Sequence, residues 1–296
     1  MVAYEGDWTA GAALYKEFAD EKFRVDATNA AKPQWVGEIQ SMVLSDLDAY
    51  GIAGLEALAK EIDPSEVVVI VPGWRYYNYD VNYPDYTAKA GIKENVAYIQ
   101  SLGYKVFVHV NLIGCDDEAP EYTQYALEDD RYLDDYSKEP FLESWTTTYS
   151  VSFWLMNPAS PDWQDLLVER LVAVYEELGV DGFHMDQSLL CYNDGRGYVN
   201  GMTSMQGNVA LMKKLSEALP NCAFSGEGTN EITARYISFL QRAPYGINTG
   251  IASGAGSYDD SKIAMITPLD AYLWSGTTRL YHYPAMPTTE NEATYN

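Results

Sequence analysis

Basic residues are scarce in this sequence. Lysine and arginine together number 19, against 43 aspartate and glutamate residues, and the formal net charge is -24. A surface this acidic repels phosphate backbones and anionic lipids, so it disfavours roles in nucleic-acid or membrane-surface binding. A neutral partner such as a carbohydrate is unaffected by the charge.

Cysteine and long apolar runs are also rare or missing. The three cysteines, Cys115, Cys191 and Cys222, are odd in number and widely spaced, so they indicate neither a disulfide framework nor a CxxC metal site. No run is long and apolar enough to span a bilayer, and the first residues lack the basic-then-apolar pattern of a signal peptide. The sequence leaves the compartment open, because a cytoplasmic and a secreted location fit it equally.

The length and composition are those of a globular protein with a sizeable core. The chain has 296 residues, 47% of them hydrophobic, which suits one large α/β barrel domain or two smaller domains. Aromatic residues reach 14%, with 25 tyrosines and 7 tryptophans. Their flat apolar faces with polar edges are suited to stacking on sugar rings, although many of them will simply fill the core.

Strand and helix patterns alternate along most of the chain, as in right-handed βα units. Residues 1–34 are predicted to hold a helix leading into a barrel, and residues 35–296 to form the barrel itself. Residues 112–156, acidic and aromatic without a clear period, interrupt the alternation after the third strand. We count about six βα units where a complete (β/α)8 TIM barrel has about eight, so we predict such a barrel truncated at its C-terminal side. The expected strands cover 35–44, 66–71, 105–111, 180–186, 221–228 and 278–283, and the expected helices 7–24, 54–62, 92–102, 161–178, 205–219 and 231–242.

The strand that follows Gly179 ends in a carboxylate. Strand alternation places His184 and Asp186 on one face, and Phe183 and Met185 on the other. In a parallel barrel the apolar pair packs outward under the helices. His184 and Asp186 then point inward at the C-terminal rim, where such barrels carry their active sites.

A second carboxylate, Glu227, ends the next strand along the chain. Adjacent barrel strands can bring their rim carboxylates to about 5–6 Å, the separation that a retaining glycosidase needs for direct attack. One ionised carboxylate attacks the anomeric carbon, while a protonated one releases the leaving oxygen and then activates water. We predict Asp186 as nucleophile, because its shorter side chain is held beside His184, and Glu227 as acid/base. A competing interpretation makes Glu227 only a favourable charge at the start of the next helix.

Two motifs resemble the alpha-amylase superfamily of glycoside hydrolases. They are Asn157-Pro158 before the helix and Gly179-Val180-Asp181-Gly182-Phe183-His184-Met185-Asp186 after it. The resemblance implies that Asp186 is the nucleophile and Glu227 the acid/base, with α-glycosidase or transglycosidase activity on oligo- or polysaccharides. In that superfamily an Arg stands where this chain has His184, and a third Asp on the seventh strand has no counterpart here.

The chain resembles still more closely a poorly characterised bacterial family of glycosidase-like barrels. The shared features are a second strand that ends in Pro72-Gly73-Trp74 and a fourth that ends in Met185-Asp186-Gln187. With the superfamily resemblance, this implies a carbohydrate substrate and no cofactor. The sequence does not indicate the oligomeric state.

Several further residues are predicted to contact the sugar. His109 and Asn111 share one face at the end of an apolar strand that aims them at the rim. Trp74 and Tyr76 belong to an aromatic loop, with Tyr77 and Tyr79, that is either a ring-stacking platform or ordinary loop packing. His184 and Gln187 complete the predicted substrate-binding set.

Two other classes of function stay open. His109, His184 and His282 each lie near the end of an expected strand, and with Asp186 they could hold a zinc ion in a metal-dependent hydrolase. No HxH or HxxEH spacing supports this interpretation, so we predict no metal. The other alternative is a barrel that binds glycans without cleaving them.

Overall fold

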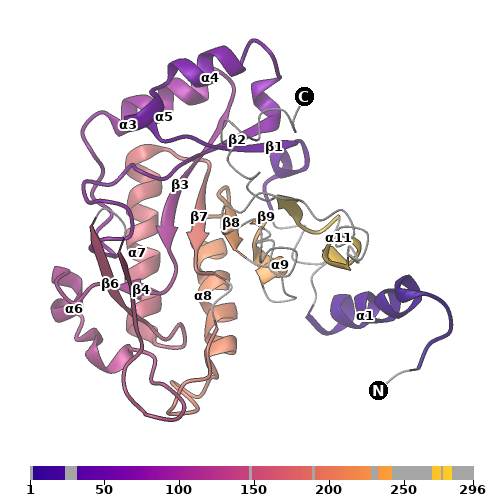
Figure 1. Cartoon of the computed structure of the whole chain (residues 1–296), viewed down its shortest axis with the longest axis vertical. Coiled ribbons are helices and arrows are strands. Elements are labelled where there is room, and N and C mark those ends of the chain that lie inside the picture. The colour runs from indigo at the N-terminus through magenta and orange to yellow at the C-terminus, as the bar shows by residue number, and fades with distance from the viewer. Residues whose placement is uncertain are drawn as a thin grey trace.

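Seven parallel strands form the central sheet of the protein. The computed structural model describes residues 3–23, 32–146, 149–188, 191–227, 233–241, 269–274 and 276–281. Within them the strand order is β1-β2-β3-β7-β8-β9-β10, curled into a nearly closed barrel (Figure 1). The strands are β1 (Ser41–Leu44), β2 (Val67–Val71), β3 (Lys105–Asn111), β7 (Gly182–Asp186), β8 (Ala223–Glu227), β9 (Phe239–Gln241) and β10 (Arg279–Tyr281). The predicted TIM-type α/β fold is confirmed.

Helices pack against the outer face of this sheet. Their apolar stripes meet the outward residues of the strands, such as Val108, Phe183 and Met185, in one buried core. No helix within the described part of the chain is long and apolar enough to cross a membrane. These helices are α3 (Leu47–Tyr50), α4 (Ala53–Leu58), α5 (Ile92–Ser101), α7 (Pro161–Leu178), α8 (Ser204–Ala218), α9 (Thr233–Tyr236) and α11 (Leu269–Trp274). Helix α1 (Trp8–Phe23) lies against α11 (Figure 1).

Helix α7 begins and ends where its sequence predicts. The Ser160 hydroxyl accepts a hydrogen bond from the backbone N–H of Trp163, and Pro161 occupies the first turn, where it needs no donor. Gly179 ends the helix at φ 68°, a left-handed conformation that costs glycine little. Because the chain then turns directly into β7, these two ends fix where the strand carrying Asp186 begins.

The lower barrel interior, near the start of the strands, is apolar. Val68, Ile70, Phe107 and Phe239 form a buried cluster there, together with Ala223. At Gly182, a Cβ atom would lie 2.4 Å from the Phe107 ring and 2.3 Å from the Ala223 carbonyl oxygen. Only glycine leaves room for that ring, so the glycine at the start of β7 allows the Phe107 ring to fill the base of the barrel.

The described residues between 112 and 156 form a small unit at the carboxyl end of β3. It contains an antiparallel sheet of order β4-β6-β5, with β4 (Gly114–Cys115), β5 (Leu142–Thr146) and β6 (Ser150–Leu155). A short helix, α6 (Pro120–Gln124), lies beside it (Figure 1). Placed there, the unit adjoins the rim of the barrel on which the predicted site residues lie.

Three boundary predictions were wrong, and one strand of the barrel was missed, as were the three short strands within residues 112–156. The helix expected over 54–62 ends at Leu58. The strand expected over 35–44 is confined to its last four residues, because Gln34–Gly37 forms a 3-10 turn. The helix expected over 231–242 contains a short helix, α9, and then β9. That three-residue strand raises the count from the six expected strands to seven.

The seam between β10 and β1 is bridged by side chains. Arg279 Nε donates to the carbonyl of Val36 at 3.2 Å, just before β1. Lys32 Nζ donates to the carbonyls of Ile237 at 3.0 Å and Thr277 at 2.7 Å. Burial lowers the pKa of Lys32 to about 7. A cavity of about 640 Å³ lies at this seam, lined in part by these residues.

Candidate active site

The carboxyl ends of β3, β7 and β8 bring polar side chains into the barrel mouth. The register pairs His109 with His184, and Asn111 with Asp186. The next pair of strands matches Met185 with Gly226, so the following residues, Asp186 and Glu227, lie side by side. The prediction that they end the fourth and fifth strands is confirmed by the strand order.

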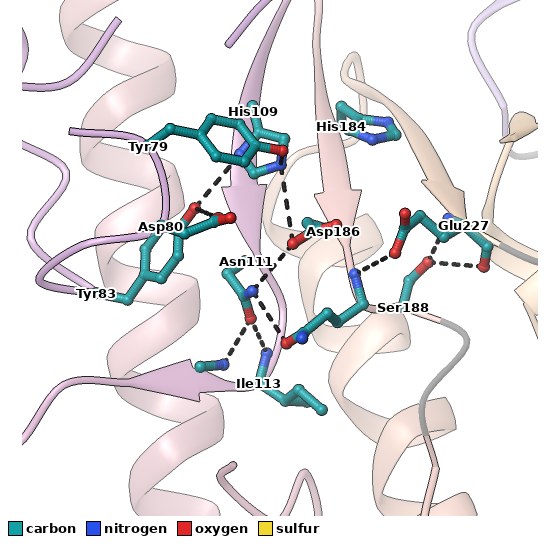
Figure 2. A network of polar contacts seen from close by, with 12 residues as sticks. Tyr79, Asp80, Tyr83, His109, Asn111, Ile113, His184, Asp186, Ser188 and Glu227 are labelled. Atoms are coloured by element: carbon teal, nitrogen blue, oxygen red, sulfur yellow. Dashed lines mark hydrogen bonds and ion pairs between the residues drawn. The ribbon is translucent and has the colours of Figure 1, made fainter. Parts of the chain in front are cut away.

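Asp186 is held by neighbours on the adjacent strand β3. Its Oδ2 accepts a hydrogen bond from Asn111 Nδ2 at 3.2 Å and lies 3.9 Å from His109 Nε2 (Figure 2). Its side chain is 15% exposed. Burial raises the pKa of Asp186 well above its usual range, and the negative charges of Glu227 and Asp80 add to the effect.

Glu227 is tied to the turn that follows β7. Its Oε2 accepts a hydrogen bond from the backbone N–H of Gln187 at 2.9 Å, and its own N–H donates to the Ser188 hydroxyl at 2.8 Å. Neighbouring strands lie about 4.8 Å apart. Because Glu227 is fixed to the residue after Asp186, the two carboxyl groups face the same space (Figure 2).

Both described histidines are buried and neutral. His109 Nε2 lies 2.7 Å from the Tyr79 hydroxyl, and His184 Nδ1 lies 2.9 Å from the Ser225 hydroxyl. Burial lowers the pKa of both, that of His184 to about 4. They therefore enter the site as uncharged hydrogen-bonding groups. His282 lies outside the described residues.

Trp74 is not a stacking platform, and this prediction needs correction. Its indole is fully buried, stacks against Tyr86 and donates from Nε1 to the His109 carbonyl at 2.7 Å. A side chain this large and apolar gains more by closing the packing between β2 and β3 than by facing water. Tyr76, in contrast, is 71% exposed and is free to meet a ligand.

The other predicted residues gather at the mouth. Figure 2 draws His109, Asn111, His184, Asp186 and Glu227 around one space. The Gln187 side-chain oxygen accepts a second hydrogen bond from Asn111 Nδ2, at 3.1 Å. Asn111 thereby ties Gln187 and Asp186 together.

Sequence reasoning missed four polar residues of the site. Ser225 lies two residues before Glu227, so the strand alternation used for His184 would have found it. Tyr281, on β10, places its hydroxyl 2.7 Å from that of Ser225 and 3.2 Å from His184 Nδ1. Asp80 and Tyr83 come from the loop between β2 and α5, and no sequence signal sets them apart from the rest of that loop.

Asp80, His109 and Asp186 form the one group within the described residues whose geometry could hold a metal ion. One ligand atom from each lies within 4.8 Å of the others. This set differs from the predicted one, since His184 is not part of it. The Tyr79 hydroxyl already contacts His109 Nε2, so an ion bound through that nitrogen would have to displace the contact.

The fold is that of several glycoside hydrolases of known structure. Alpha-N-acetylgalactosaminidase NagBb from Bifidobacterium bifidum, ligand-free, matches with a TM-score of 0.66 at 15% identity, over 93% of this chain and 49% of that chain. A GH31 family sulfoquinovosidase from E. rectale matches with a TM-score of 0.52 at 13% identity, over 75% of this chain and 36% of that chain. The maltogenic alpha-amylase AmyB from Thermotoga neapolitana matches with a TM-score of 0.53 at 11% identity, over 82% and 58% of the two chains.

These likenesses define the class of fold, a glycosidase-type barrel, and confirm the resemblance noted in the sequence at that level. The chain spans about half the length of NagBb. No curated protein matches the sequence. The protein belongs to the family described as a domain of unknown function (DUF6259), which it matches over residues 1–272.

Proposed function

We propose that the protein is a retaining glycoside hydrolase. Asp186 attacks the anomeric carbon of a bound sugar, and Glu227 protonates the departing glycosidic oxygen. The resulting glycosyl ester on Asp186 is then released by a water molecule that Glu227 deprotonates. If a sugar hydroxyl replaces the water, the same steps give transfer instead of hydrolysis.

The observation that carries this proposal is the placement of the two carboxyl groups. They end neighbouring parallel strands, in register, at the rim where barrel enzymes bind their substrates. Adjacent strands give the short separation between carboxyl groups that suits direct attack. In an inverting enzyme the two carboxyl groups lie about 6.5–9.5 Å apart, because a water molecule must fit between them and the sugar.

The electrostatics supports one shared proton. Asp186 has a pKa raised by burial and by the charge of Glu227, so the pair keeps one proton where two isolated carboxyl groups would keep none. Positive charge developing at the anomeric carbon favours the ionised form of Asp186, which moves the proton to Glu227. Asn111 then donates its hydrogen bond to the ionised nucleophile.

The substrate we propose is an α-linked oligo- or polysaccharide. Two neighbours, NagBb and AmyB, carry alpha-glycosidase names. His109, His184 and Gln187 would position hydroxyl groups of the sugar, and the exposed Tyr76 would offer a stacking face. No cofactor takes part in this chemistry.

The test is covalent trapping of the nucleophile. Wild type, Asp186→Asn and Glu227→Gln are incubated with mechanism-based cyclitol probes in α- and β-configured forms, and intact mass is measured. We expect one α-configured probe to add its mass to the wild type and not to Asp186→Asn. Asp165→Asn, an exposed carboxylate on α7 paired with Lys214, is the matched control and should label like the wild type.

Each outcome separates two interpretations. Labelling by a β-configured probe alone would keep the retaining mechanism and overturn the α assignment. Labelling that persists in Asp186→Asn would remove Asp186 from the nucleophile role. No labelling of folded wild type, together with glycan binding by calorimetry, would favour a non-catalytic glycan-binding barrel.

A second candidate function, metal-dependent hydrolysis, is favoured by the cluster of Asp80, His109 and Asp186. A zinc ion held by these three groups would keep a position open for water, as catalytic zinc sites do. Activity that disappears with a chelator and returns with added zinc would support this candidate. Activity unaffected by prolonged chelation would exclude it.

A further inference from the structure

A third carboxylate enters the barrel mouth from the loop between β2 and α5. Asp80 is 5% exposed, and its backbone has a left-handed φ of 61°. Its Oδ1 accepts a hydrogen bond from the Tyr83 hydroxyl at 2.9 Å. Figure 2 shows its carboxylate turned toward Asp186 and His109.

The loop that carries Asp80 is held by a buried arginine. Arg75 is 2% exposed, and its Nη1 donates to the carbonyls of Val81 at 3.0 Å and Asp85 at 3.1 Å. Its guanidinium also lies 4.1 Å from the centre of the Tyr83 ring. Arg75 Nη2 also donates to the carbonyl of Asn78 at 3.2 Å, so the guanidinium binds the backbone on both sides of Asp80. It holds the loop in place without forming an ion pair with the Asp80 carboxylate.

A purely structural role does not require a charge at this position. Asparagine adopts the left-handed conformation at least as readily, and its amide oxygen would accept the same hydrogen bond from Tyr83. Burial and the nearby Glu227 disfavour the ionised carboxylate and raise the pKa of Asp80 to about 6. A buried carboxyl group that points into the barrel mouth, although its ionisation is disfavoured there, is typical of a ligand-binding group.

We propose that Asp80 is a substrate-binding carboxylate, whose second oxygen accepts hydrogen bonds from hydroxyl groups of the sugar ring attacked by Asp186. This inference rests on the proposed glycosidase function. Sugar hydroxyls are donors that fit an acceptor-only group, and hydrogen bonds to a charged acceptor are stronger than neutral ones. Asp80 thereby selects a glycon with hydroxyl groups at the matching ring positions.

The same three side chains could instead hold a divalent cation. A sugar hydroxyl can bind Asp80 without displacing Tyr79 from His109, whereas an ion bound through His109 Nε2 cannot. The metal is therefore one of the outcomes of the test.

The first experiment compares Asp80→Asn with the control Asp85→Asn. Asp85 belongs to the same loop, and its Oδ1 accepts a hydrogen bond from the backbone N–H of Thr87 at 2.9 Å. The substrates are the 4-nitrophenyl glycoside of the sugar whose cyclitol probe labels the wild type, and its monodeoxy analogues. We expect Asp80→Asn to lower kcat/KM for the parent glycoside by about 10- to 100-fold, the value of a charged hydrogen bond. Asp85→Asn should match the wild type.

The deoxy analogues identify the hydroxyl that Asp80 binds. With the wild type, one or two analogues should show a kcat/KM reduced by the same factor as that of the parent glycoside with Asp80→Asn. For these analogues, Asp80→Asn should reduce kcat/KM no further. Equal losses for every analogue on both proteins would overturn the contact. Loss of bound zinc in Asp80→Asn, with chelator-sensitive wild-type activity, would overturn it in favour of the metal.

A second readout follows the nucleophile itself. The charge of Asp80 raises the pKa of Asp186, so its removal should move the acid limb of probe labelling to lower pH in Asp80→Asn and not in Asp85→Asn. Wild type that labels while Asp80→Asn keeps both its rate and its pH profile would overturn only the role of Asp80. Wild type that labels with no probe would overturn the glycosidase function, and the role of Asp80 with it.

Discussion

The base and the mouth of the barrel use the same strands for opposite purposes. On β3, Phe107 lies in the apolar cluster at the base, and His109 and Asn111 lie above it on the same face. On β7, Gly182 makes room for the Phe107 ring, while Asp186 ends the strand beside Glu227. Within five residues, each strand passes from a region of apolar packing to one with buried polar groups, and β7 and β8 end in acids.

This difference shows that the base of the barrel contributes stability, whereas the mouth carries the candidate functional groups. Burying apolar side chains contributes about 25 cal/mol for each Å² removed from water, and the base does this without polar groups. The mouth retains carboxyl groups whose pKa values are raised by burial, which means that their ionised forms destabilise the fold. Substitutions in the two regions should therefore act in opposite directions.

The largest expected effect is on activity, from Asp186→Asn in the mouth. Loss of the nucleophile should lower kcat by about 10⁴-fold. The melting temperature should stay equal or rise at neutral pH, because the variant no longer buries an ionisable acid. Steady-state rates with an aryl glycoside and thermal unfolding check both parts. A destabilised variant that keeps its activity would contradict the division between the two regions.

The next effect is on stability, from Phe107→Ala at the base. Removing a fully buried phenyl ring should cost about 3–5 kcal/mol in the free energy of unfolding, measured in urea. At low temperature, where the variant is folded, kcat should stay within a few-fold of the wild type. Phe107→Leu is the matched control, and its cost should be clearly smaller because most of the volume is kept. A loss of kcat equal to that of a mouth variant would place the base in the active site.

A third effect depends on pH and comes from Asp80→Asn. The pKa of Asp80 is about 6 in the folded protein, against 3.8 for the unperturbed group. Its ionisation therefore removes stability as pH rises from about 4 to about 6, by about 3 kcal/mol at about 1.4 kcal/mol for each pKa unit. The variant should match the wild type below pH 4 and be more stable above pH 6. Urea unfolding at pH 4 and pH 7 measures this, and equal stabilities at both pH values would be contrary to it.

The smallest effect concerns Tyr76, an exposed residue of the loop between β2 and α5. Tyr76→Ala should raise KM for a long oligosaccharide by about 3- to 10-fold, the value of one aromatic contact, and leave kcat and stability unchanged. Tyr136→Ala is the control, since Tyr136 is 95% exposed and lies in the unit formed by residues 112–156. If both variants behave alike, Tyr76 is an ordinary surface residue.

The sequence was most informative about features that depend on the residue pattern of a single strand. The bounds of β3, the inward face of β7, and the consecutive carboxylates Asp186 and Glu227 follow from alternation and strand order alone. Trp74 could not be assigned this way, because its burial depends on Tyr86 and on a carbonyl of β3.

Asp80 and β9 were missed for different physical reasons. Asp80 points inward because Arg75 folds the loop around it, which involves contacts between residues of that loop and not a periodic pattern. The strand β9 has only three residues, too few to show alternation, and its pairing with β8 and β10 is what defines it.

The bridged seam has a consequence for the order in which the barrel forms. Lys32 and Thr277 are separated by 245 residues, and Val36 and Arg279 by 243. At about 5–20 residues per second, translation of the intervening chain takes about 12–50 s. Until then the unpaired edge of β1 lacks its cover, and an open parallel edge can recruit another chain. A nascent chain therefore exposes that edge throughout the interval between synthesis of Val36 and synthesis of Arg279.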